Sequence, residues 1–229
     1  METNKNEIIL NDNPKSSFSE SIKSIRANLK FSDLDGNKKV ILMTSANPGE
    51  GKSFITANLA AAFAKDNKKT LIIDADLRKG RQHRIFQTKN NTNLGYSNMI
   101  VNVNKEGFDI TSYINKTSIP NLDFINLGAT PPSPTELLSA DNNKILLNIL
   151  KEKYDYIFLD CPPVLGLSDT LILSRLSDYN IVVATNKKTK LENLIDVKKA
   201  FEKAKTSVTG VILNQVEKKH NNYYGYYGE

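Results

Sequence analysis

The segment Ala46–Ser53, with the sequence ANPGEGKS, restricts the possible folds of this chain more than any other. It follows the apolar run Val40–Met43 and precedes a helical pattern over Ser53–Lys65. A strand, a glycine-containing loop that ends in Lys-Ser and a helix form the usual surroundings of a phosphate-binding loop, although Ala46 replaces its first glycine. Glycines let backbone N–H groups converge on phosphate oxygens. The sequence therefore predicts a loop that binds a nucleoside triphosphate.

Short β-branched runs alternate with helical patterns along most of the chain. Runs that are apolar on both faces are typical of parallel sheets. With 229 residues we expect one α/β domain, a doubly wound, mostly parallel sheet of the P-loop NTPase fold. Residues 89–120 show no clear periodicity. The expected strands are Val40–Met43, Thr70–Ile73, Leu122–Ile125, Tyr156–Leu159, Ile181–Ala184 and Val211–Leu213, and the expected helices are Ser53–Lys65, Ser133–Lys151, Thr170–Ser177 and Leu191–Lys205.

The two ends of the chain differ from its centre. Residues 1–15 are largely polar and are expected to be a flexible segment. A helix is expected over 16–31, where Ser17 and Glu20 have the spacing of a capping box. Residues 217–229 hold a glycine-punctuated tyrosine cluster without a hydrophobic stripe, and we expect a flexible tail. The domain proper is thus expected to span residues 16–216.

Composition narrows the choice of partners and compartment. The formal charge is +6 and the pI about 9.2, but the lysines are scattered, so no nucleic-acid surface is expected. The single cysteine, Cys161, excludes an intramolecular disulfide and suits a reducing cytoplasm. We interpret it as a small buried residue, and His83 as a surface histidine. No signal peptide and no apolar stretch of about 18 residues is present, so a cytoplasmic protein is expected.

Carboxylates follow two of the expected strands. Asp74 and Asp76 come after the strand Thr70–Ile73, and Asp160 follows Tyr156–Leu159 at the Walker B position. Ligands bind at the carboxyl edge of open α/β sheets, so these acids are expected near the phosphates. We expect Ser53, Asp74, Asp76 and Asp160 to hold magnesium, and Lys52, Asp74, Asp76 and Asp160 to be catalytic. The expected nucleotide-binding residues are Gly49, Glu50, Gly51, Lys52, Ser53, Phe54 and Asn214.

These motifs together resemble the bacterial tyrosine kinases of capsule and exopolysaccharide synthesis. That family combines a Walker A loop, an apolar run followed by Asp-x-Asp, a Walker B strand followed by Asp-x-Pro, and a terminal tyrosine cluster. The matching segments in this chain are Ala46–Ser53, Leu71–Arg78 and Ile157–Pro163, and the tyrosines of residues 217–229 match the cluster. The resemblance implies ATP and Mg²⁺ as cofactors and autophosphorylation in trans. The implied acceptors are Tyr223, Tyr224, Tyr226 and Tyr227.

The resemblance also implies partners. An acidic-x-x-basic-x-x-Arg motif builds a ring of subunits in this family, and here it is Glu20, Lys23 and Arg26, with lysine where arginine is usual. A membrane-bound activator of the polysaccharide co-polymerase kind is implied, which would recruit the kinase to the inner face of the plasma membrane.

Two other functions remain open from the sequence. A ParA/MinD-like positioning ATPase would share the fold but would carry a lysine at the place of Asn47. A nucleotide-dependent scaffold without catalysis is disfavoured by the intact Lys52 and the three carboxylates. The tyrosine-rich end could also be a terminus without a substrate role.

Overall fold

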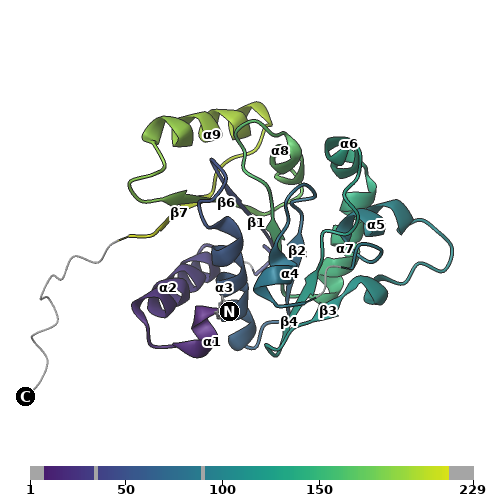
Figure 1. Ribbon diagram of the computed structural model, residues 1–229, viewed down its shortest axis with the longest axis horizontal. Helices are drawn as coiled ribbons and strands as arrows, with labels where there is room; N and C mark the ends of the chain where they lie inside the picture. Colours follow the sequence, from purple (N-terminus) through teal and green to yellow (C-terminus); the bar gives the residue numbers. More distant parts are fainter. Residues whose placement is uncertain (1–7, 34–35, 89–90, 217–229) are drawn as a thin grey trace, which may run out of the picture.

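A central sheet with helices on both faces forms this protein (Figure 1). The computed structural model describes residues 8–33, 36–88 and 91–216. Within these ranges the sheet has seven strands in the order β3-β4-β2-β5-β1-β6-β7, and β3 alone of them runs antiparallel to its neighbour. The doubly wound, mostly parallel sheet expected from the sequence is confirmed. The strands are β1 Val40–Ser45, β2 Thr70–Asp74, β3 Asn115–Lys116, β4 Leu122–Ile125, β5 Tyr156–Asp160, β6 Tyr179–Thr185 and β7 Gly210–Asn214.

Helices from the first part of the chain cover one face of the sheet, and later helices cover the other. Side chains alternate along a strand, so Ile41 and Met43 of β1 face α3, while Val40 and Leu42 face the opposite layer. The first layer holds α1 Ile9–Asp12, α2 Ser17–Phe31, α3 Lys52–Lys65 and α4 Gln82–Ile85. The second holds α5 Tyr96–Asn102, α6 Pro134–Ser139, α7 Asn142–Lys153, α8 Asp169–Leu173 and α9 Leu191–Lys203, together with the 3-10 helix η1 Ile110–Tyr113.

The amino-terminal segment differs from its expected flexibility. Ile8 and Leu10 are 3% and 2% exposed and pack with α3 in the core of the first layer. Leu10 also accepts, through its carbonyl oxygen, a hydrogen bond from Lys65 Nζ. The expectation of a loose segment is therefore wrong for residues 8–12, because two of the three consecutive apolar residues at positions 8–10 find buried sites within an otherwise polar stretch.

Helix boundaries also depart from the sequence pattern. The expected helix Ser133–Lys151 is two helices, α6 and α7, because Ala140 is extended. The side-chain amide of Asn143 donates to the carbonyl oxygens of Leu137, Leu138 and Ala140, which lose helical partners at the break. Helix α8 ends at Leu173, four residues before the expected Ser177. The N-cap of α2 is Ser16, not Ser17: its hydroxyl accepts from the backbone N–H of Ser19.

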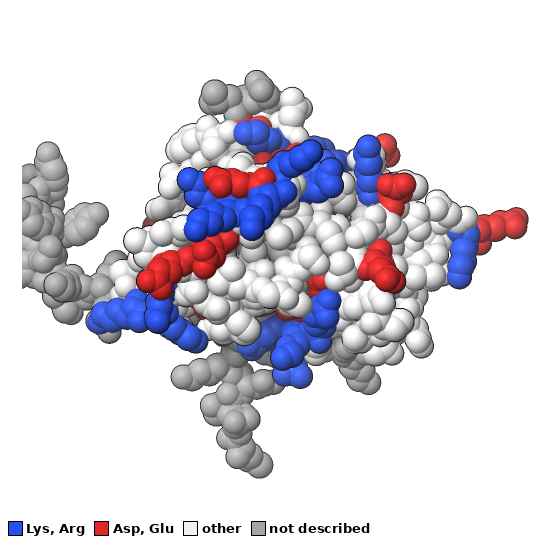
Figure 2. Space-filling model, turned by 90° about the horizontal axis from the view of Figure 1, so that it is seen from above, with Lys and Arg blue, Asp and Glu red and all other residues white. Residues whose placement is uncertain are grey.

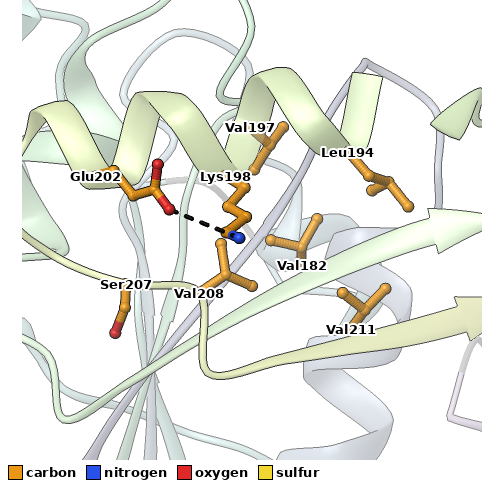
Figure 3. Close-up of a pocket in the computed structure, with 8 residues that line it drawn as sticks. All are labelled: Val182, Leu194, Val197, Lys198, Glu202, Ser207, Val208 and Val211. Carbon is orange, nitrogen blue, oxygen red and sulfur yellow. Dashed lines mark ion pairs between the residues drawn. The ribbon is translucent and has the colours of Figure 1, made fainter. Parts of the chain in front are cut away.

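The sheet ends at β7, whose outer edge has no neighbouring strand among the described residues. An apolar groove of about 280 Å³ lies between this strand and α9 (Figure 3). Lys198 and Glu202 pair across 3.7 Å at its rim. Seen from the α9 side, acidic and basic side chains are interspersed (Figure 2). No helix of the described residues is long and apolar enough to cross a membrane.

Candidate active site

The phosphate-binding loop connects β1 to α3 at the carboxyl edge of the sheet. Gly49 and Gly51 have φ angles of +79° and +87°, a left-handed conformation that glycine adopts without strain. Gly51 has a second reason to be glycine, because the Asn214 amide occupies the space that a Cβ would need. Asn214 Nδ2 donates to the carbonyl oxygen of Glu50 at 3.1 Å. The last strand therefore buttresses the loop through Asn214.

The Glu50 side chain lies inside the loop, where it is 1% exposed. Its Oε2 accepts from the backbone N–H of Asn47 at 3.0 Å, and its Oε1 accepts from the Thr189 hydroxyl at 2.6 Å. The Thr185 hydroxyl donates to the Glu50 carbonyl oxygen at 3.1 Å. Glu50 thus fastens the loop to the turn after β6.

The two residues after Lys52 have different surroundings. Ser53 is 6% exposed, and its hydroxyl lies 3.3 Å from Lys52 Nζ. The Phe54 ring packs against Phe18 of α2, with ring centroids 5.2 Å apart. The Phe54 side chain therefore belongs to the interface between α2 and α3, and its backbone is the part of this residue near the loop.

Lys52 lies between two of the carboxylates. Its Nζ is 3.3 Å from Asp76 Oδ2 and 3.3 Å from Asp160 Oδ1. Burial alone would lower the pKa of Lys52, but the neighbouring carboxylates, led by Asp160, outweigh burial and raise its pKa. The lysine is therefore a stable cation at the centre of the site.

The three carboxylates differ in exposure and in partners. Asp76 is 4% exposed, and its Oδ1 accepts from the backbone N–H groups of Arg78 and Lys79. Asp74 and Asp160 are completely buried. Burial raises the pKa of Asp74 well above its usual range, and the Asp160 charge raises it further. The structure thus brings together Lys52, Ser53 and all three aspartates expected from the sequence.

Gln82 and Gly80 belong to this site, and the sequence motifs do not reveal them. Gln82 Nε2 donates to Asp160 Oδ2 at 2.9 Å and to the Ser53 carbonyl oxygen at 3.2 Å. The Gln82 backbone N–H donates to Asp74 Oδ2 at 3.0 Å. A Cβ on Gly80 would stand 2.6 Å from the Asp74 carboxyl carbon. The only sequence signal was their position a few residues after the Asp-x-Asp motif.

An ion pair supports the far side of the Asp-x-Asp motif. Arg78 Nε lies 2.7 Å from Asp169 Oδ2, and its terminal nitrogen donates to Asp169 Oδ1 at 3.2 Å. Thr135 donates to the same Oδ1 at 2.7 Å. Asp169 is completely buried, so the bidentate arginine compensates a charge that water cannot reach.

Known proteins resemble this chain over most of its length. A family model described as an AAA domain matches residues 38–214. CapB of Staphylococcus aureus is 36% identical, over 97% of this chain and 95% of its own length. YwqD, a tyrosine-protein kinase of Bacillus subtilis (strain 168), is 36% identical over 96% of this chain and 91% of its own. The chain belongs to the bacterial tyrosine kinase family. The resemblance in its sequence motifs is thereby confirmed, and so is its class as a tyrosine-protein kinase.

Solved structures resemble this chain to different degrees. The chimerical protein CapA2B2 has a TM-score of 0.85 and 33% identity, covering 93% of the kinase and 91% of its own chain. MinD of Pyrococcus horikoshii, solved with Mg-ADP, has a TM-score of 0.62 and 23% identity over 76% of the kinase and 69% of its own chain. The likeness to MinD is one of fold alone. The P-loop fold expected from the sequence is confirmed.

The site of the kinase contains side-chain oxygen atoms that could bind a magnesium ion. Among the described residues, no three or more acidic, histidine or cysteine side chains form a preassembled metal cluster. Magnesium in nucleotide sites usually takes one or two protein oxygens, and phosphate and water supply the others. Asp74 Oδ1 is buried without a hydrogen-bond partner in the described part of the chain. The donor set of Ser53 and the aspartates therefore fits Mg²⁺ bound together with a nucleotide.

Cys161 and His83 of the kinase lie near the site without being part of it. Cys161 is completely buried, as expected, and burial raises the pKa of its thiol. A buried neutral thiol is a packing residue rather than a nucleophile. His83 is half-buried, and burial lowers its pKa. The expectation of a surface histidine is thus only partly met.

Helix α2 of the kinase carries Glu20, Lys23 and Arg26. Lys23 Nζ pairs with Glu20 Oε1 at 2.7 Å and donates to the carbonyl oxygen of Pro14. Arg26 turns toward α3, where it donates to the carbonyl oxygen of Ala62 at 2.9 Å. The expected acceptors Tyr223, Tyr224, Tyr226 and Tyr227 lie outside the described residues.

Proposed function

We propose that this kinase uses ATP and Mg²⁺ to phosphorylate its own terminal tyrosines Tyr223, Tyr224, Tyr226 and Tyr227 in trans, and thereby regulates capsular polysaccharide synthesis. The observation that carries the proposal is the position of Lys52. It lies at the start of α3, beside the glycine loop and within 3.3 Å of both Asp76 and Asp160. A lysine that follows a loop of convergent N–H groups binds phosphate oxygens, and the neighbouring acids suit proton transfer and metal binding.

The proposed base is Asp76, with Asp74 as the second candidate. A tyrosine hydroxyl has a pKa near ~10, so a carboxylate that accepts its proton assists attack on the γ-phosphate. Asp76 is held by two backbone N–H groups and retains 4% exposure, whereas Asp74 is completely buried beneath Gly80. A base must reach a hydroxyl that comes from outside, and this requirement favours Asp76.

Lys52, Ser53 and Asp160 have the supporting roles. When ATP binds, Lys52 would exchange its carboxylate partners for phosphate oxygens and balance the charge that develops on them. Ser53 and Asp160 would be the metal ligands nearest to the loop. Bound magnesium would supply further positive charge at the phosphates. Asn214, which already contacts the loop, would be the side chain nearest to the base of the nucleotide.

The kinase is proposed to act as a ring of identical subunits with a membrane-bound activator of the polysaccharide co-polymerase kind. Glu20 is exposed and Lys23 is partly exposed on α2, where another subunit could reach them. Arg26 would have to leave the Ala62 carbonyl oxygen to join such an interface. The name of the chimera CapA2B2 joins a CapA part to a CapB part, which supports a two-protein system. Recruitment would place the kinase at the inner face of the plasma membrane.

Phosphorylation of the tail would work as a switch in this scheme. Each phosphate adds about −1.5 to −2 charges at neutral pH. A multiply charged tail would be repelled by a neighbour's site that contains three aspartates, so the ring would dissociate. The prediction fails if the fully phosphorylated protein keeps the oligomer size of the unmodified protein.

The test is incubation of the kinase with ATP and magnesium, with and without the activator segment, followed by mass spectrometry of the terminal peptide. Phosphate on the four tyrosines that disappears in the Lys52→Met variant supports the proposal. ATP consumption with an unmodified tail under both conditions would contradict it and favour a positioning ATPase. Normal phosphorylation by Lys52→Met would remove the loop from the mechanism.

A further inference from the structure

The turn between β6 and α9 is held firmly against the phosphate-binding loop. The backbone N–H groups of Lys188 and Thr189 both donate to the carbonyl oxygen of Thr185, at 3.2 and 2.9 Å. The Thr185 N–H in turn donates to the Thr189 hydroxyl at 2.8 Å. Through Glu50, the same two threonines are bonded to the loop itself. The backbone of Lys188 therefore has a fixed position relative to the loop.

The ammonium group of Lys188 lies over the loop. Its Nζ is 3.6 Å from the point where a Cβ on Gly49 would stand. Within the described ranges Lys188 makes no ion pair, whereas Lys52 has both Asp76 and Asp160. The preceding residue, Lys187, has a left-handed backbone with φ of 61°, which is uncommon for a side chain of this kind and marks a tightly specified turn.

A cation in this place has a physical use. The N–H groups of the glycine loop converge on one concave region, and the N-terminus of α3 adds positive potential there. An ammonium group without a carboxylate partner strengthens that potential for any anion in the loop. Lys52 is also a cation, but it projects from the first position of α3 toward the aspartates. Lys188 comes from a different element and lies at Gly49.

We propose that Lys188 is a second phosphate-binding lysine, which contacts the phosphate chain of the bound nucleotide from the Gly49 side of the loop. The inference rests on the proposed nucleotide binding and extends it to a residue outside the motifs. In this assignment Lys188 determines how tightly the nucleotide is held. Its hydroxyl-bearing neighbours, Thr185 and Thr189, set its position through Glu50.

Equilibrium binding of ADP with magnesium, measured by calorimetry at low salt, tests the proposal without phosphotransfer. We expect Lys188→Ala to weaken binding about tenfold, since a charge-assisted bond to phosphate is lost. Lys188→Arg keeps the charge and should restore binding to within about threefold. Lys190→Ala is the matched control, because this exposed lysine lies two residues away and carries the same charge. It should bind ADP as the unaltered kinase does.

Two results would overturn the inference. One is ADP binding by Lys188→Ala within about twofold of the unaltered kinase, and the other is an equal loss in Lys190→Ala, which would indicate net charge alone. The assay also separates this inference from the proposed function. If Lys188→Ala binds ADP weakly but the unaltered kinase leaves its tail unmodified, the lysine assignment holds and autophosphorylation fails. A kinase that binds no ADP would overturn both.

Discussion

Asp74 and Asp160 are direct partners in the register of the adjacent parallel strands β2 and β5. In-register residues of parallel strands point to the same face, so two completely buried carboxylates lie side by side. Asp160 has the side-chain amide of Gln82 and the ammonium group of Lys52 as partners, and Asp74 has the backbone N–H of Gln82. Burial is the main cause of the raised pKa of Asp74, and the like charge of Asp160 raises this pKa further because two adjacent carboxylates oppose simultaneous ionisation.

Asp74→Asn is therefore expected to stabilise the ligand-free kinase by about 1–2 kcal/mol at pH 7. Because the folded-state pKa is raised above the ordinary value of 3.8, wild-type Asp74 keeps its proton to higher pH in the folded chain than in the unfolded chain. Its charge thus costs stability only as pH rises above about 4, and the gain from asparagine should shrink toward that pH. Urea unfolding at pH 4.5 and 7 measures both values. Asp196→Asn, on the exposed face of α9, is the control, and a destabilised Asp74→Asn at pH 7 would contradict the argument.

Gly80→Ala should disrupt the site by steric contact alone. The new Cβ would stand 2.6 Å from the Asp74 carboxyl carbon, and Gly80 has no positive φ that would add strain. We expect a loss of about 1–3 kcal/mol in unfolding free energy and at least tenfold slower tyrosine phosphorylation. Gly210→Ala is the matched control, since its nearest atom is the flexible Ile181 Cδ1 at 3.3 Å. Equal behaviour of the two variants would show that Gly80 has no special role.

Arg78→Ala should destabilise the kinase by about 2 kcal/mol at pH 7, because it leaves the buried carboxylate of Asp169 without its arginine. This loss is smaller than the loss expected from breaking a fully buried ion pair, because Arg78 is partly exposed. The pKa of Asp169 is lowered: burial opposes this shift, but the bonds from Arg78 and Thr135 outweigh it. A lowered pKa gives stability that is present above about pH 4 and lost as pH falls further, so the two proteins should converge in acid.

Thermal and urea unfolding across this pH range measure the effect of Arg78→Ala. Lys151→Ala breaks a looser contact of 3.9 Å with Asp178 and should cost little. A difference between Arg78→Ala and the unaltered kinase that stays constant down to pH 3 would count against the charge argument.

The parts of the fold and site that sequence reasoning found are those that local patterns determine. The glycine loop, the buried strands and the aspartates at strand ends all follow from neighbours in the chain. Gln82 and the pair Thr185 and Thr189 could not be found this way. The side chain of each bonds a residue of the phosphate-binding loop or of the start of α3 that lies 29 or more positions away, and this contact exists only after the sheet has formed.

The wrongly predicted helix boundaries also result from contacts between residues far apart in the chain. The break between α6 and α7 depends on Asn143, whose amide replaces the lost helical bonds and whose Oδ1 accepts from Tyr96. Nothing in the local pattern signals that partnership. The burial of Ile8 and Leu10 could have been anticipated, since three consecutive apolar residues at positions 8–10 interrupt a polar stretch.

Thr189→Val tests whether the turn after β6 shapes the nucleotide loop. The substitution keeps the side-chain volume but removes the hydroxyl that donates to Glu50 at 2.6 Å and accepts from Thr185, so a completely enclosed carboxylate loses a partner. We expect a loss of about 1–3 kcal/mol in stability and severalfold weaker ADP binding, because the loop and the turn both lose their fixed positions. Thr189→Ser retains the hydroxyl and should keep most of both properties. If Thr189→Val binds ADP as tightly as Thr189→Ser does, Glu50 stabilises the fold without positioning the loop.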